Sequence, residues 1–201
     1  ASAPVSLLAP PPPPSPLAVA TNYFGFGFTH IVPKGLDHIL FVLGLFLLAL
    51  RLKPLLWQVT AFTVAHTITL GLTVYGVLAL PATLVEPLIA ASIVYVAVEN
   101  LLTSRLHAWR VALVGACGLL HGMGFAGVLQ EIGLPPGEFA TALVSFNVGV
   151  ELGQLAVIAG AFLAVGWWGR DRPGYRARVV IPGSAAIALT GLYWTVERLG
   201  G

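Results

Sequence analysis

Six long apolar runs constrain this chain more than any other feature. Each run is long enough to cross the roughly 30 Å hydrocarbon layer of a bilayer as a helix. Only 9% of the 201 residues are charged, against about a quarter in a typical soluble domain, so lipid rather than water surrounds most of the chain. The sequence therefore predicts an all-α, polytopic membrane helix bundle with about six transmembrane helices. The predicted spans are 36–52, 55–79, 83–103, 109–130, 138–166 and 177–198.

The N-terminal part of the chain divides into two further segments. Residues 1–21 are rich in proline, which favours polyproline II or disorder, and we expect a linker there. Residues 22–35 alternate aromatic residues with glycine, which predicts an interfacial or re-entrant segment. Residues 36–201 then form the transmembrane helical domain.

Basic residues predict the orientation of the bundle. Eight of the ten lie in alternate loops, at 51 and 53, at 105 and 110, and at 170, 172, 176 and 178. The positive-inside rule places those loops in the cytoplasm, so both termini are expected outside, in a multi-pass protein of a bacterial-type inner membrane. The net charge of +2 gives no reason to expect a nucleic acid partner. The lipid bilayer and a metal ion are the expected partners, and a homo-oligomer stays open.

Short internal matches suggest a repeat. Residues 35–38 resemble 118–121, and residues 62–65 resemble 146–149, at offsets of 83 and 84. Under the predicted topology the matching spans run in opposite directions, as in an inverted three-plus-three repeat. The alternative is chance similarity between apolar sequences.

A few polar side chains fall inside or beside the predicted spans, where a charge costs on the order of 3 kcal/mol. Such residues usually face the interior of a bundle, and glycines beside them, such as Gly118, Gly122, Gly149 and Gly153, allow helices to approach closely. Imidazole together with carboxylate suits nickel, cobalt or zinc. The alternative is that these groups only link helices by hydrogen bonds. The candidate metal ligands are His30, Asp37, His38, His66, Glu99, His121, Asn147 and Glu151.

Two further polar residues are expected to have other roles. His107 lies in a basic cytoplasmic loop and is predicted to be interfacial rather than a ligand. Glu86 precedes a proline and is predicted to begin a helix, where a carboxylate favours the helix dipole.

Five segments resemble the HupE/UreJ family, of which the chain looks like a divergent branch. They read GLDHILF at 35–41, FTVAHT at 62–67, VENL at 98–101, LHG at 120–122 and FNVGVE at 146–151. Members of this family accompany hydrogenase and urease systems and are regarded as nickel permeases. The resemblance implies uptake of a divalent metal ion.

Three functions follow as hypotheses. The leading one is a permease for a divalent transition-metal ion of the nickel or cobalt type, with the ion as substrate. In it Asp37, His38 and His30 capture the ion, His66, His121, Asn147 and Glu151 bind it near the midplane, and Glu99 lines the exit. The second is an intramembrane zinc-dependent hydrolase with Glu99 or Glu151 as general base. The third is a membrane anchor or assembly partner of an N-terminal extracytoplasmic domain. No hydrolase motif such as HExxH occurs in the sequence, so a transporter is preferred to an enzyme.

Overall fold

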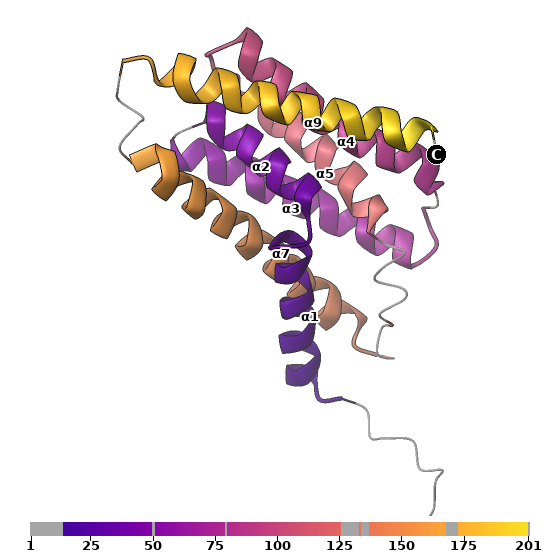
Figure 1. Cartoon of the computed structure of the whole chain (residues 1–201). Coiled ribbons are helices and arrows are strands. Elements are labelled where there is room, and N and C mark those ends of the chain that lie inside the picture. The colour runs from indigo at the N-terminus through magenta and orange to yellow at the C-terminus, as the bar shows by residue number, and fades with distance from the viewer. Residues whose placement is uncertain are drawn as a thin grey trace, which may run out of the picture.

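The computed structural model describes residues 14–49, 51–78, 80–125, 133, 137–167 and 173–200. All regular structure in these residues is helical, which confirms the predicted all-α membrane bundle (Figure 1). The elements are α1 (Pro16–Ile31), α2 (Leu36–Leu48), α3 (Leu52–Val74), α4 (Ala82–Leu102), α5 (Arg110–Gly124), α7 (Phe139–Ala161), η1 (Phe162–Gly166), η2 (Arg176–Val180) and α9 (Ile181–Gly200). The π-helical segment η1 extends α7, and η2 leads into α9.

Four helical segments among the described residues are long and apolar enough to cross a membrane. They are Leu52–Val74, Ala82–Leu102, Phe139–Gly166 and Arg176–Gly200, and all four coincide with predicted spans to within a few residues. A fifth span results if α1 and α2, which meet at a bend of 69°, cross together. Helix α5 is shorter, at 15 residues, and residues 126–130 of its predicted span lie outside the described part. The total of six spans and the outer position of both termini stay predictions.

Helix α1 begins inside the segment expected to be a linker. Pro16 occupies the first helical position, where a missing N–H costs nothing, and the Ser15 side chain accepts a hydrogen bond from the Ala18 N–H at 3.3 Å. Residues 16–21 are therefore helical, whereas residues 1–13 of the expected linker lie outside the described part. The aromatic residues after position 22 continue the same helix up to Ile31.

Close helix crossings hold the bundle together. Helix α1 lies along α7, α3 along α5, and α4 along α9 (Figure 1). At the α1–α7 crossing a Cβ atom on Gly149 would lie 2.2 Å from the Phe24 carbonyl oxygen. At the α3–α5 crossing a Cβ on Gly118 would lie 2.4 Å from the Phe62 carbonyl oxygen. Both crossings therefore require glycine, as the small residues in the sequence indicated.

We expect Gly149→Ala to destabilise the protein, because the added methyl meets backbone atoms of α1 that cannot move aside independently. Overpacking of this kind costs about 1–3 kcal/mol, which would lower the unfolding temperature measured in detergent. Gly160→Ala in the same helix is the matched control, because a Cβ there would have no atom of the described residues within 4 Å. Equal unfolding temperatures for the two variants would contradict the proposed role of the crossing.

Candidate metal centre

The bend between α1 and α2 brings two histidines together. His30 lies in the last turn of α1 and His38 in the first turns of α2, and their ring centroids are 4.7 Å apart. The chain turns between them through residues 32–35. Gly35 makes this turn possible, since a Cβ there would lie 2.2 Å from the His30 carbonyl oxygen.

Two more histidines reach the same place from α3 and α5. The His38 ring centroid lies 5.9 Å from that of His66 and 4.9 Å from that of His121. A Cβ on Gly122 would lie 2.3 Å from the His66 carbonyl oxygen, so the glycine crossing of α3 and α5 sets this approach. We call His30, His38, His66 and His121 the imidazole cluster.

Three members of the cluster have the spacing of metal ligands. One ring nitrogen from each of His30, His38 and His66 lies within 4.8 Å of the other two. Zinc–imidazole bonds are about 2.0–2.1 Å long, so shifts of less than about 1 Å would let the three nitrogens hold one ion. His121 adjoins this triad through its contact with His38.

Hydrogen bonds fix the tautomers of two of these rings. The Asn147 side-chain N–H group donates to the Leu143 carbonyl at 2.8 Å, which turns the Asn147 amide oxygen toward His66 Nδ1 at 3.0 Å. His121 Nδ1 lies 2.9 Å from the Cys117 carbonyl oxygen. Both oxygens can only accept, so each Nδ1 carries the proton and each Nε2 presents a lone pair. Rings oriented in this way are typical of metal-binding histidines.

The Nε2 atoms of all four rings are buried without a hydrogen-bond partner among the described residues. An unsatisfied buried polar atom costs about 1–3 kcal/mol. Four such atoms, on His38 and on three rings whose centroids lie 4.7–5.9 Å from that of His38, are hard to explain as helix packing alone. They are the donors that a transition-metal ion prefers.

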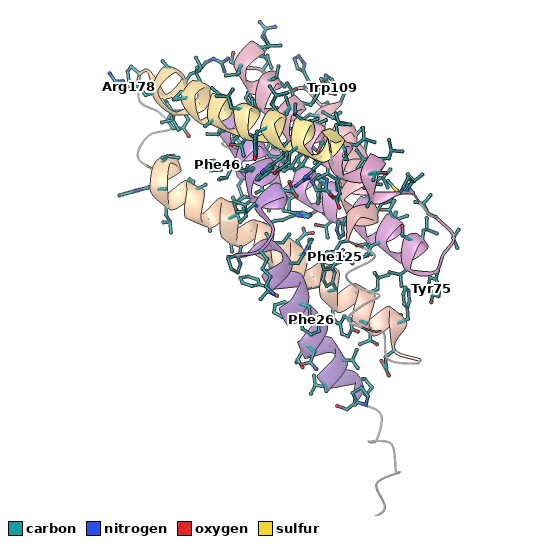
Figure 2. The ribbon with its side chains drawn as sticks, turned by 45° about the vertical axis from the view of Figure 1, so that its right-hand side comes forward. Phe26, Phe46, Tyr75, Trp109, Phe125 and Arg178 are labelled. Atoms are coloured by element: carbon teal, nitrogen blue, oxygen red, sulfur yellow. The ribbon has the colours of Figure 1, made fainter. Side chains whose placement is uncertain are left out.

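Aromatic side chains surround the imidazole cluster. Phe62 lies on one side, with its ring centroid 5.0 Å from that of His121. Phe125 covers His30 at 3.9 Å and stacks on Phe146. Figure 2 shows Phe125 where α1 meets the rest of the bundle. These rings form an apolar wall on part of the site, and electrostatic interactions beside such a wall are stronger than in bulk water.

A cavity of about 620 Å³ leads to the imidazole cluster. His30, His38 and His121 line its inner part, and the exposed Lys34 and Glu86 lie at its other end. Asp37 and Arg198 also line this outer end, which we call the mouth. The mouth lies near the end of α3 marked by Tyr75, and Figure 2 shows Tyr75 and Arg178 at opposite ends of the bundle.

The three carboxylates predicted as ligands lie outside the imidazole cluster. Asp37 forms an ion pair with Arg198, whose Nη2 lies 3.1 Å from both carboxylate oxygens. Glu99 pairs with the fully buried Arg110 at 2.9 Å. Glu151 accepts a hydrogen bond from Thr60 at 2.7 Å. Asn147 supports His66 from the side of the ring that faces away from Nε2. His107 lies elsewhere, against Trp109.

Sequence reasoning missed two residues of the mouth, Arg198 and Lys34, and gave Glu86 only a structural role. A signal for the two basic residues did exist. Lys34 and Arg198 are the two basic residues that fall outside the alternate loops of the positive-inside pattern.

The helices and the imidazole cluster define a multi-pass α-helical membrane protein with a buried group of histidines. The chain belongs to the HupE/UreJ family, because the family model described as HupE / UreJ protein matches residues 13–198. Comparison with curated proteins and with solved structures gives no match.

The tautomers can be tested without any metal. In ¹⁵N-histidine NMR spectra we expect His66 and His121 to carry the proton on Nδ1. Asn147→Leu removes the acceptor beside His66, so that ring should shift to the Nε2–H form. His121 is the internal control, because its acceptor is a backbone carbonyl that the substitution leaves in place. An unchanged His66 spectrum would contradict the assignment.

Proposed function

We propose that this protein is a permease for a divalent transition-metal ion of the nickel or cobalt type, in a bacterial-type inner membrane. The observation that carries the proposal is the convergence of three buried imidazoles and the partly buried His30, whose Nε2 atoms have no partner in the part of the chain that the structure describes. Membership of the HupE/UreJ family agrees with transport of a metal ion. The ion is the substrate, and the imidazole cluster is its binding site within the membrane.

The cavity supports uptake from the outer side. Under the orientation expected from the basic loops, the mouth faces outward and leads to the imidazole cluster. An ion entering there meets His30 at the C-terminal end of α1, where the helix dipole favours positive charge. The bent pair of helices resembles the discontinuous helices that form ion sites in other transporters.

The opposite side of the imidazole cluster is closed. Along α5, Cys117 and the fully buried Val114 separate His121 from Arg110 by about 16 Å of helix. Phe41 and Phe62 belong to the same apolar cluster as Val114. An ion cannot pass such a dry segment without a change in helix packing. We therefore infer transport by alternating access rather than through an open channel.

The other two hypotheses have less support. A hydrolase needs a general base close to its metal-bound water. The two glutamates considered for that role interact elsewhere, Glu99 with Arg110 and Glu151 with Thr60. A membrane anchor would not need four grouped imidazoles whose Nε2 atoms are unpaired among the described residues.

Uptake of Ni²⁺ or Co²⁺ into liposomes that contain the purified protein tests the proposal. We expect His66→Ala and His121→Ala each to reduce the initial rate about tenfold or more, because each removes a nitrogen donor of the cluster. Each substitution also leaves a cavity, and each removes the hydrogen bond made by the ring Nδ1, so we expect both variants to unfold at a lower temperature than the wild type. Uptake is therefore compared only between preparations that are folded at the assay temperature.

His107→Ala is the matched control, since it removes the same side chain from a position against Trp109, outside the imidazole cluster. Its uptake rate should stay close to that of the wild type. Wild-type uptake no faster than that of empty liposomes would overturn the proposed function.

A further inference from the structure

Two basic residues at the mouth stand out from the charge pattern of the chain. Lys34 and Arg198 are the two of ten basic residues that lie outside the alternate loops, and both line the cavity that leads to the imidazole cluster. Positive charge at the mouth of a cation permease opposes the substrate. Its presence there calls for a physical reason.

Arg198 is held in the mouth by three contacts from three helices. Its Nη2 atom lies 3.1 Å from both oxygens of Asp37 on α2. Its Nη1 atom donates to the Glu86 carbonyl on α4 at 3.2 Å. Its guanidinium carbon lies 5.5 Å from the ring centroid of Trp194 on α9. The side chains of Arg198 and Asp37 are only 21% and 28% exposed, so their ion pair is weakly screened.

Asp37 lines the same cavity as His38, so its carboxylate is accessible from the space that leads from the mouth to the imidazole cluster. With Arg198 bound, this carboxylate is neutralised. A monovalent cation that displaced the guanidinium would put one unit positive charge beside Asp37 in place of another, and would gain no electrostatic energy at the same distance. A divalent cation would interact with Asp37 about twice as strongly as the guanidinium at the same distance.

We propose that Arg198 is a specificity-determining residue: it occupies Asp37 so that divalent cations, which can displace it, pass the mouth in preference to monovalent ones. This inference rests on the proposed permease function for its substrate. The displaced guanidinium stays close, because the Glu86 carbonyl and the Trp194 ring still hold it. Arg198 can therefore return to Asp37 once the ion has moved on to the imidazole cluster.

The charge barrier can be measured without metal transport, by the reaction of a thiol behind the mouth. The probe is His38→Cys in a Cys117→Ala background, which removes the native cysteine. Cationic and neutral methanethiosulfonate reagents of similar size are applied to the protein in liposomes. The ratio of their two reaction rates reports the barrier to a monovalent cation. The ratio is measured in three proteins: the probe background itself, the background with Arg198→Gln, and the background with Arg198→Lys.

We expect Arg198→Gln to raise the ratio of cationic to neutral rates about fivefold or more, because one positive charge is lost and Asp37 is left free. Arg198→Lys keeps the charge and should keep the ratio near that of the parent. An unchanged ratio in Arg198→Gln overturns the inference. Equal acceleration of both reagents also overturns it, because that result means that Arg198 only packs α9 against its neighbours.

The second readout is Ni²⁺ uptake by proteins that keep His38, with and without Arg198→Gln. Replacing sucrose by K⁺ outside the liposomes should slow Ni²⁺ uptake by Arg198→Gln much more than uptake by the wild type. If the wild type takes up no Ni²⁺ but the ratio of thiol reaction rates still depends on Arg198, the permease function is overturned and the charge barrier at the mouth stands. Normal uptake with an unchanged thiol ratio would overturn only the role of Arg198.

Discussion

The constraint on which this structure depends is the grouping of four imidazoles, three of them buried and His30 partly buried, among apolar and aromatic side chains. A buried imidazole has two ring nitrogens, and each loses its bonds to water. The protein satisfies Nδ1 of His66 and of His121 with oxygens that can only accept, and leaves Nε2 of every ring without a partner among the described residues. Such a group lowers the stability of the fold unless something binds it. Departures of this kind from good packing are expected at functional sites.

The bend between α1 and α2 makes the cluster possible. In a continuous helix His30 and His38 would lie more than two turns apart, about 12 Å along the helix axis, and their rings could not come into contact. The bend instead ends α1 beside His30 and begins α2 beside His38, so the chain folds back on itself at Gly35. The negative end of the α1 dipole then lies beside His30, and Asp37 offsets the positive end of α2.

Much of the fold could be predicted from the sequence, because lipid leaves few alternatives to long apolar helices. The four long spans follow from hydropathy alone, and the glycines at 118, 122 and 149 mark the helix crossings. The extent of α1 could not be predicted in this way. Its start is marked only by Ser15 and Pro16 at the end of a proline-rich run, and its glycines and aromatic residues resemble an interfacial segment as much as a helix packed on α7.

The sequence predicted which residue types the candidate site contains better than it predicted which of those residues lie together. Helical spacing shows which residues share a face of one helix, but not which faces of different helices meet. For that reason His30, His38, His66 and His121 could be named, whereas the separate positions of Glu99 and Glu151 could not be foreseen. The partners of the carboxylates come from residues distant in sequence. Arg198 reaches Asp37 across 161 positions, a pairing that no local pattern indicates.

A carboxylate is paired with an arginine at both ends of the apolar interior. The pairs are Asp37–Arg198 at the mouth and Glu99–Arg110 at the opposite end. The Glu99–Arg110 pair is the more buried, and Arg110 also donates to Asn100, which in turn donates to the Gly44 carbonyl of α2. Taking both charges out of water costs several kcal/mol per ion. The Coulomb attraction of the pair and the bond to Asn100 offset that cost only in part, because the Glu99 oxygens make no well-directed hydrogen bond among the described residues. The four rings of the imidazole cluster lie between these pairs, and the Nε2 atoms of His66 and His121 present lone pairs there. Under the proposed function, a cation would leave such a site more readily than it would leave a ring of negative charges.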